Sequence, residues 1–202
     1  VGGGFVSGGT LLGKNRPACS EIGHLRPGLQ ADAPETTVES IASGWGIVAA
    51  VQEKLSGHLH TVPLQAQDTE LDVVELQQKL AEAWEAQEEY AQDLLYRCHC
   101  DTDQITGQMV AHAATEGNPL AQSVINHACQ VLGWAIAQTV TLLAPEIVVI
   151  GGGVSLMGEQ LFFAPVRRAA AQYVFPPLAG HYTIEPAALG ESVVVHGAIL
   201  LA

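Results

Sequence analysis

Basic and aromatic residues are scarce in this sequence. Only 8 of the 202 residues are Lys or Arg against 21 Asp or Glu, which gives a formal net charge of −13 at pH 7. A field of that sign repels polyanions, and there is no basic stripe and no helix-turn-helix pattern, so we expect no nucleic-acid contact by this segment. Aromatic residues make up 5%, and the core must therefore be built from Ala, Val, Leu and Ile.

Long apolar runs are missing as well. The uninterrupted apolar stretches are far shorter than the roughly 20 residues that cross a bilayer, and no signal peptide opens the sequence. Four cysteines without a secretory context indicate reduced thiols. We therefore expect a cytoplasmic protein without a membrane contact. The sequence begins at Val1, without an initiator Met and directly before a glycine run, so we expect it to be part of a longer chain.

The spacing of apolar residues predicts helices and strands. Two apolar runs around Ser7-Gly8-Gly9 are typical of a β-hairpin. The stretch 71–98, rich in Leu, Ala, Gln and Glu, favours a helix with one acidic, solvated face. Helices and strands alternate in the second half, which favours an α/β domain. The other predictions are helices over 38–55, 105–115, 119–143, 156–173 and 191–202, a buried parallel strand over 146–150 and a strand over 181–185.

Three glycines, Gly151, Gly152 and Gly153, follow the predicted strand 146–150. Ligands of α/β sheets bind beyond the carboxyl ends of the strands, and a helix that begins there favours phosphate. However, the sequence contains neither GxGxxG nor GxxxxGK[ST], so neither a Rossmann nor a P-loop fingerprint fits. From these residues alone, nucleotide contact and tight strand-to-helix packing are equal alternatives.

Two carboxylates and an imidazole lie near the predicted hairpin. The motif Glu-x-Gly-His supplies Glu21 and His24, and Glu-x-x-Ala-Ser-Gly begins at Glu39. A bound sugar needs several convergent acceptors, because each buried hydroxyl without a partner costs on the order of 1–3 kcal/mol. Chemistry alone favours the alternative, in which Glu39 is an ordinary acid at a helix start and the other two are ordinary loop residues.

The order of these motifs resembles the ROK family (repressor, open reading frame, kinase). The run ITGQMVAHAATEGNPLAQ…APEIVVIGGGV is similar to the family's succession of helix, turn, long buried helix and Gly-Gly-Gly strand. A glycine hairpin, Glu-x-Gly-His and Glu-x-x-Ala-Ser-Gly follow one another as in ROK glucokinases, fructokinases, N-acetylmannosamine kinases and sugar-responsive repressors. The resemblance implies an α/β fold, the actin-like, ribonuclease-H-related C-terminal lobe, with a mixed sheet and helices on both faces.

The resemblance also implies which residues bind ligands. In the family, the two glutamates and the histidine of these motifs hold sugar hydroxyls, one glycine run ends the second phosphate loop, and the other contacts the adenosine of ATP. Carried over, the substrate-binding residues are Glu21, His24 and Glu39, and the cofactor-binding residues are Gly2, Gly3, Gly4, Gly151, Gly152 and Gly153. The implied ligands are ATP, Mg²⁺ and a hexose or N-acyl hexosamine.

Two family features are absent from the sequence. The interval 25–38 contains no cysteine, so the family's structural zinc site, three thiolates and a histidine, cannot form, and we expect no such zinc. Cys98-His99-Cys100 is a metal-binding alternative, although a frayed helix end is the more common outcome. The family's catalytic Asp and first phosphate loop have no counterpart either, so we predict no catalytic residue and no metal ligand here.

These observations predict the C-terminal lobe of an ATP-dependent, glucokinase-like hexose kinase that is inactive by itself. Whether the parent is an enzyme stays uncertain at this point. The alternatives are the sugar-sensing domain of a ROK transcriptional repressor and a non-catalytic sugar-binding protein. Residues 1–202 are predicted to form one lobe, with a helical insertion at 56–103 that covers the cleft or makes a dimer contact, and we expect a homodimer.

Overall fold

The computed structural model describes residues 1–192, apart from 14–15, 17–18 and 59–88. The chain divides into two compact units. The first unit consists of Val1–Ile47 and Ile125–Ala202, and the second of Val48–Val124. Helices α2 and α5 each begin in one unit and end in the other. The single lobe over 1–202 therefore stays a prediction, and most of the predicted insertion lies outside the described residues.

The first unit opens with the predicted hairpin. Strands β1 (Val6–Ser7) and β2 (Thr10–Leu11) are antiparallel. Gly8 and Gly9 connect them with φ values of 55° and 75°. A two-residue turn with positive φ at both positions matches the twist of the flanking strands, and glycine adopts it without steric cost. The hairpin prediction is confirmed.

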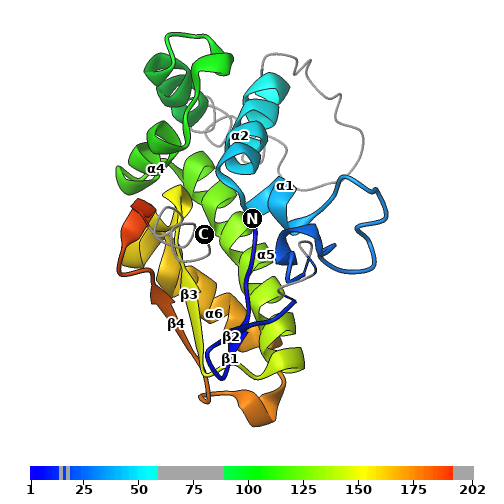
Figure 1. The fold of residues 1–202 in the computed structure, drawn as a ribbon. Helices are drawn as coiled ribbons and strands as arrows, with labels where there is room; N and C mark the ends of the chain where they lie inside the picture. Colours follow the sequence, from blue (N-terminus) through cyan, green and yellow to red (C-terminus); the bar gives the residue numbers. More distant parts are fainter. Residues whose placement is uncertain (14–15, 17–18, 59–88, 193–202) are drawn as a thin grey trace, which may run out of the picture. The chain divides into compact units, whose positions relative to one another are not determined.

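A two-stranded parallel sheet forms the second part of this unit (Figure 1). Strand β3 (Ile147–Ile150) pairs with β4 (Thr183–Pro186), which confirms the predicted parallel pairing. The prediction that this strand is buried is wrong, because Ile147 is 54% and Val149 56% exposed. Among the described residues β3 has one partner strand, and the two side chains are each more than half exposed.

Two helices pack beside the sheet in the first unit. Helix α5 (Pro119–Leu143) follows the predicted 119–143. Helix α6 (Ala164–Tyr173) is shorter than predicted, because Gly153–Met157 form a 3-10 helix and Glu159–Phe163 a π-helix before it. The predicted final helix, 191–202, lies almost wholly outside the described residues. Buried apolar side chains of this unit include Ile125, Leu132, Ile136, Val140, Phe162, Phe163, Val166 and Ile184.

The second unit is helical in its described part. It contains most of α2 (Gly44–His58), the helical residues 89–97, a 3-10 turn at Thr102–Gln104, α4 (Gly107–Thr115) and the first residues of α5. The prediction of a helix over 105–115 is thus confirmed. Its core is built from Val51, Leu55, Ala91, Leu94, Cys98, Ile105, Val110, Ala113, Ala114, Ala121 and Val124. The small side chains of this list fit the low aromatic content of the sequence.

Asn118 ties two helical segments of the second unit together. Its side chain is 5% exposed. Nδ2 donates to the carbonyl of Tyr90 (2.9 Å) and to Oδ2 of Asp93 (2.8 Å), and Oδ1 accepts from the backbone N–H of Ala121 (3.1 Å). It is therefore the N-cap of α5 and also the link from α5 to the helical residues 89–97.

Asn118→Ala is expected to lower the free energy of unfolding by roughly 1–2 kcal/mol, because it removes a helix cap and leaves buried acceptors without a donor. Urea denaturation followed by circular dichroism measures the change. Asn126→Ala is the matched control, since Asn126 is exposed on the same helix. Equal stability of the two variants would contradict the role assigned to Asn118.

An ionic cluster surrounds the same region. Arg97 donates to Oδ1 of Asp93 (2.9 Å) and also pairs with Glu116. Burial acts to raise the pKa of Asp93, but hydrogen bonds from Arg97 and Asn118 outweigh it and hold this pKa below its usual value. The Asp93 carboxylate therefore stabilises the fold when it is ionised.

The lowered pKa of Asp93 predicts a loss of stability in acid. A carboxyl group with a depressed pKa contributes stability above its unfolded pKa, near 4, and this contribution disappears as the pH falls through the folded pKa. Urea denaturation between neutral and acid pH measures it. Asp93→Asn lacks this contribution at neutral pH. The difference in the free energy of unfolding between this variant and the unmodified chain should therefore shrink as the pH falls. A difference independent of pH would contradict this assignment.

Candidate functional site: a groove with two glycine runs

A break between two helices positions Glu39. Helix α1 (Val38–Ala42) starts at a capping box, in which Oγ1 of Thr37 accepts from the N–H of Ser40 (3.1 Å) and Oγ of Ser40 accepts from the N–H of Thr37 (3.0 Å). Ser43 then leaves the helical conformation, with φ −78° and ψ 164°. Its Oγ accepts from the N–H of Gly46 (3.1 Å) at the start of α2. The single helix predicted over 38–55 is therefore two helices.

The break changes which residues face the core. Val51 is fully buried, as the helical spacing predicted, but Trp45 is 58% exposed. The prediction placed both on one apolar face because it assumed a continuous helix. Ser43 and Gly44 interrupt that continuity, and the serine hydroxyl competes for the backbone N–H groups as an N-cap does.

Gly46 allows the two helices to approach closely. A Cβ at this position would lie 2.3 Å from the carbonyl oxygen of Ser40. At Gly44, two residues earlier, the nearest atom to such a Cβ is in the Val154 side chain, 3.8 Å away. Only the first contact requires a backbone shift, so Gly46 fixes how α1 lies against α2.

Gly46→Ala is expected to lower the free energy of unfolding by roughly 1–2 kcal/mol, because overpacking against the backbone exceeds the helix propensity gained. Gly44→Ala is the matched control and should change stability little. Thermal or urea denaturation of both variants measures this. If Gly46→Ala proves as stable as Gly44→Ala, the close approach does not fix the geometry of α1.

The first glycine run packs against the loop that carries Glu21. A Cβ on Gly3 would lie 2.5 Å from the carbonyl oxygen of Ser20, and one on Gly23 would lie 1.9 Å from the carbonyl oxygen of Val1. Two backbones can approach this closely only without side chains. The Cβ position of Gly2 is 3.8 Å from Oε2 of Glu21, so the glycine run lies directly beside this carboxylate.

Glu39 and His24 are the other two predicted sugar ligands. Oε1 of Glu39 accepts from the N-terminal ammonium of Val1 (2.8 Å). Both side chains reach solvent, since His24 is exposed and Glu39 half-buried.

One groove of about 630 Å³ in the first unit brings the two glycine runs together. Gly2, Gly3 and Gly4 line it with Glu21, and Gly151, Gly152 and Gly153 line it too. His24 and Glu39 are not among its lining residues, so the structure joins Glu21 with the glycines but does not bring all three predicted sugar ligands into the groove. Apolar side chains form much of the remaining wall, namely Leu132, Ile136, Leu142, Leu143, Ile147 and Val149.

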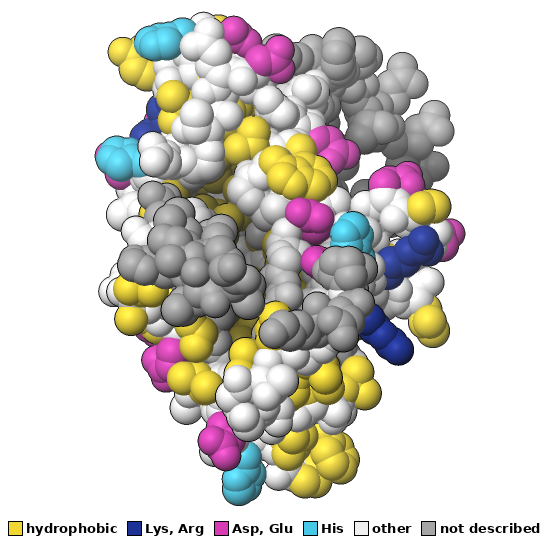
Figure 2. All heavy atoms as spheres, viewed as in Figure 1, with side chains coloured by type: hydrophobic (Ala, Val, Ile, Leu, Met, Phe, Trp, Pro, Cys, Tyr) yellow, Lys and Arg dark blue, Asp and Glu magenta, His cyan; other side chains and the backbone are white. Residues whose placement is uncertain are grey.

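The surface beside the groove is apolar. Val6 is 62% and Leu142 81% exposed. Figure 2 shows apolar side chains gathered over the lower part of the face, where the hairpin and the end of α5 lie. The spacing of apolar residues did not predict this wall. The signal was present in the apolar run at the end of α5, but periodicity alone assigns such residues to a core rather than to a groove.

The second glycine run fits a ligand that approaches the backbone. Gly152 has a φ of 94°, and no atom lies within 4 Å of a Cβ built on Gly152 or Gly153. A nucleotide could approach this turn without meeting a side chain. Ser43 and Gly44, at the start of α2, line the same groove, and a helix N-terminus favours phosphate. Glu21 is the single carboxylate of the described lining, so Mg²⁺ would depend mainly on phosphate oxygens.

The cysteines divide between core and surface. Cys98 is buried, and desolvation is the main cause that raises its pKa, whereas Cys100 is exposed. Burial raises the pKa of Cys129 to about 12, as expected of a small core residue. No three His, Cys, Asp or Glu side chains gather as possible metal ligands within the part of the chain that the structure describes. None of its described helices is long and apolar enough to cross a membrane.

Comparison with known proteins decides the family. Residues 1–202 match the model of a family described as the ROK family. The chain belongs to the ROK family. The ROK chain is 29% identical to a glucokinase from Halalkalibacterium halodurans over 202 residues, which cover 98% of this chain and 51% of that protein. The family resemblance inferred from the motifs is therefore confirmed.

Solved structures agree on the fold of the ROK chain. A ROK family glucokinase from Streptomyces griseus, in complex with glucose and AMPPNP, has a TM-score of 0.73 at 24% identity, with 100% of this chain and 56% of that chain covered. A ROK family transcriptional regulator, a homologue of the E. coli MLC protein, has a TM-score of 0.59 at 20% identity, with 92% of this chain and 38% of that chain covered. These likenesses confirm the actin-like α/β fold.

The ROK chain spans about half the length of the relatives it matches. Family and fold together make it a sugar-kinase-like or ROK regulator domain.

Proposed function

We propose that residues 1–202 are the C-terminal lobe of an ATP-dependent hexose kinase of the glucokinase type. The observation that carries this proposal is the single groove that contains Glu21 and both glycine runs. Sugar kinases must hold a polar hydroxylated substrate beside a nucleotide, and this groove supplies a carboxylate next to side-chain-free backbone. The relative from Halalkalibacterium halodurans bears the name glucokinase, which supports the same assignment.

The proposed sugar ligands are Glu21, His24 and Glu39. Carboxylates accept hydrogen bonds from sugar hydroxyls, and a hydrogen bond to a charged group contributes about 1.5–3 kcal/mol. Glu21 lines the groove, while Glu39, which accepts from the nitrogen of Val1, and His24 are outside its lining. A bound sugar would therefore bridge the groove to this pair. A hexose or an N-acyl hexosamine has hydroxyls enough for such a set.

The proposed nucleotide site consists of the two glycine runs. Gly151, Gly152 and Gly153 would lie against the adenosine, and Gly2, Gly3 and Gly4 near the phosphates. The nucleotide and its Mg²⁺, when bound, supply the phosphoryl group and part of the charge neutralisation that transfer requires. The chain's own residues hold and orient the two substrates, and Ser43 and Gly44 offer backbone N–H groups at the start of α2.

Transfer itself would need groups beyond residues 1–202. A sugar hydroxyl attacks the γ-phosphorus of ATP, ADP leaves, and the hydroxyl proton must pass to a positioned base. The family's base and first phosphate loop have no counterpart in this sequence, so we propose that this chain alone binds substrates without phosphorylating them. The parent protein is proposed to be a cytoplasmic homodimer that does not contact nucleic acid through this lobe.

Isothermal titration calorimetry of the chain with glucose, N-acetylmannosamine and ATP tests the proposal. A kinase lobe is expected to bind one of the sugars and ATP. Binding of sugar without ATP would favour the sugar-sensing domain of a ROK regulator, which the likeness to a ROK transcriptional regulator keeps open. Binding of neither ligand would overturn the assignment in favour of a non-catalytic protein.

A further inference from the structure

Ser20 has a backbone conformation that L-residues avoid. Its φ is 68°, in the left-handed region, which residues other than glycine seldom occupy. Such a conformation persists only where the surrounding structure enforces it, and residues of this kind gather at ligand sites. Ser20 is half-buried, lines the groove and directly precedes Glu21, the carboxylate of the same groove. The strained residue therefore lies next to a proposed sugar ligand.

The strained residue leads into a tight turn centred on Glu21. The N–H of Ile22 donates to the carbonyl of Ser20 (2.9 Å). A hydrogen bond across one residue closes a γ-turn, and the φ of −75° and ψ of 71° at Glu21 are those of an inverse γ-turn. The N–H of His24 then donates to the carbonyl of Glu21 (3.1 Å). The turn thus fixes both backbone dihedral angles of Glu21, and with them the direction in which its side chain leaves the backbone.

The carbonyl of Ser20 is held from two sides. It accepts from the N–H of Ile22, and it lies so near the first glycine run that a Cβ on Gly3 would be 2.5 Å away. A change of Ser20 to the extended or the right-handed helical region would rotate this carbonyl out of both contacts. The γ-turn would then open. Oε2 of Glu21, which lies 3.8 Å from the Cβ position of Gly2, would move away from the wall of the groove.

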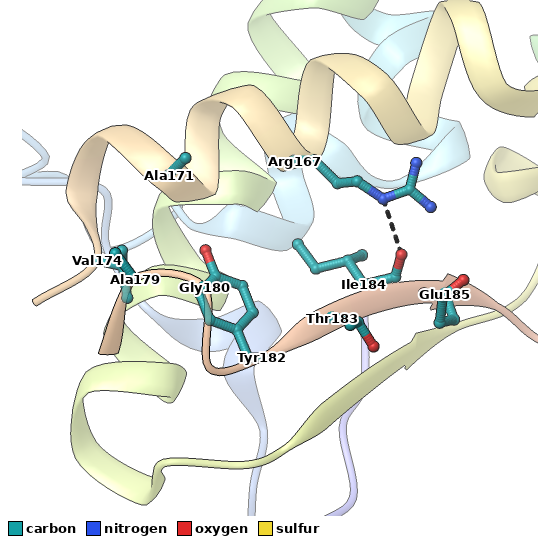
Figure 3. Close-up of a pocket in the computed structure, with 9 residues that line it drawn as sticks. All are labelled: Arg167, Ala171, Val174, Ala179, Gly180, Tyr182, Thr183, Ile184 and Glu185. Atoms are coloured by element: carbon teal, nitrogen blue, oxygen red, sulfur yellow. Dashed lines mark hydrogen bonds between the residues drawn. The ribbon is translucent and has the colours of Figure 1, made fainter. Parts of the chain in front are cut away.

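Glu185 shows how a carboxylate is positioned without such a turn. It lines a second cavity of the first unit, of about 290 Å³, between α6 and β4 (Figure 3). Its backbone belongs to β4, where it pairs with Val149 of β3. In a strand the pleat fixes the direction of each side chain. Glu21 lies outside the strands and α-helices, so its direction depends on the γ-turn and on Ser20.

We propose that Ser20 is a positioning residue of the sugar site: its left-handed conformation holds Glu21 in the γ-turn that directs the carboxylate to the sugar. This role rests on the proposed function, because it takes Glu21 as a ligand of sugar hydroxyls. The backbone of Ser20 carries the role and its hydroxyl does not. Among the described residues, the side-chain contact of this hydroxyl is with the sulfur of Cys19 (3.7 Å), a weak hydrogen-bonding partner.

Substitutions that favour or disfavour the left-handed region test this role. Glycine adopts the region readily, whereas a β-branched residue there is an outlier. Ser20→Gly should therefore keep the sugar affinity within about twofold, and Ser20→Val should weaken it at least about tenfold, as loss of a hydrogen bond to a charged group does. Calorimetric titration with glucose or N-acetylmannosamine, whichever binds the unmodified chain, measures both. Equal losses in the two variants would assign the role to the hydroxyl and overturn the proposal.

A strained valine elsewhere controls for a general loss of stability. His99 is exposed, belongs to the second unit, has a φ of 54° and does not line the groove. His99→Val should leave the sugar affinity unchanged, and a loss equal to that of Ser20→Val would overturn the proposal. Urea denaturation shows whether each variant is folded. If Ser20→Val is not, Ser20→Ala replaces it: it should bind the sugar more weakly than Ser20→Gly, although both lack the hydroxyl, and equal affinities would contradict the role.

A double-mutant cycle shows whether Ser20 acts through Glu21. In a Glu21→Ala chain there is no carboxylate to direct, so Ser20→Val should change the sugar affinity by no more than about twofold. The full loss in this background would overturn the proposal. If Glu21→Ala weakens binding and Ser20→Val does not, the positioning role fails while the proposed function stands. If the unmodified chain binds neither sugar, or Glu21→Ala binds as tightly as the unmodified chain, the sugar assignment of Glu21 fails and the role of Ser20 fails with it.

Discussion

Gly133→Ala is expected to lower the free energy of unfolding by about 3 kcal/mol. A Cβ at this position of α5 would lie 2.5 Å from Cβ of Ala169 and 2.8 Å from both the N of Ala170 and the carbonyl oxygen of Val166. Two of these three atoms belong to the backbone of α6 and cannot move without shifting the helix. Alanine gains about 1 kcal/mol of helix propensity over glycine, which is smaller than the overpacking cost.

A control and a second variant separate overpacking from other effects. Gly107→Ala is the control, because no atom lies within 4 Å of a Cβ built there, and it should be neutral or slightly stabilising. In a double-mutant cycle, Ala169→Gly should partly rescue Gly133→Ala, with a coupling of at least about 0.5 kcal/mol. Urea denaturation gives the free energies of unfolding of the four chains of the cycle and of the Gly107→Ala control. A Gly133→Ala chain as stable as the unmodified one would show that α5 and α6 do not cross as closely as the structure has them.

Gly133 also illustrates what the sequence could not reveal. Periodicity predicted the whole length of α5, because its apolar residues recur at helical spacing. From the same pattern, a glycine inside the helix is only a weak helix former. The close approach of α6 depends on tertiary packing, which the local sequence does not determine. The parallel strand at 146–150 followed from its β-branched run between helices, and a strand was also predicted over 181–185, whereas the exposure of β3 depends on its surroundings in space.

The candidate site was predictable only through resemblance. Chemistry alone favoured ordinary positions for Glu21, His24 and Glu39, since nothing local says that a loop and a helix start meet in space. The structure places Glu21 in the groove with both glycine runs, and leaves His24 and Glu39 outside its lining. Periodicity also predicted one helix where the structure has two. The hydroxyl of Ser43 accepts from the N–H of Gly46, so that α1 ends and α2 begins beside Glu39.

The glycine run at Gly2–Gly4 has two roles that the sequence could not separate. Gly3 permits the approach of its backbone to Ser20, which is a packing requirement. The same run lines the groove, where the proposed function assigns it to phosphate. Because a larger side chain would disturb both, substitution of these glycines cannot distinguish them, and the carboxylates are the better positions for testing ligand contact.

Glu21→Gln is expected to weaken sugar binding by about 10–100-fold. The glutamine keeps the size of the side chain and one acceptor oxygen but loses the charge, and a hydrogen bond to a charged group is worth about 1.5–3 kcal/mol. Calorimetric titration with the sugar that binds the unmodified chain measures the change. Glu21 is exposed in the free chain, so the substitution should leave the free energy of unfolding nearly unchanged.

Glu35→Gln is the matched control for this experiment. Glu35 is also exposed, lies in the first unit and does not line the groove. Glu35→Gln removes the same charge from the chain. A long-range electrostatic effect would therefore change the sugar affinity of both variants, whereas direct contact with a hydroxyl would change only that of Glu21→Gln. Because exposed charges more than about 10 Å apart are largely screened at 0.1 M salt, the two explanations separate further as salt is added. Equal affinities of the two variants would remove Glu21 from the sugar site.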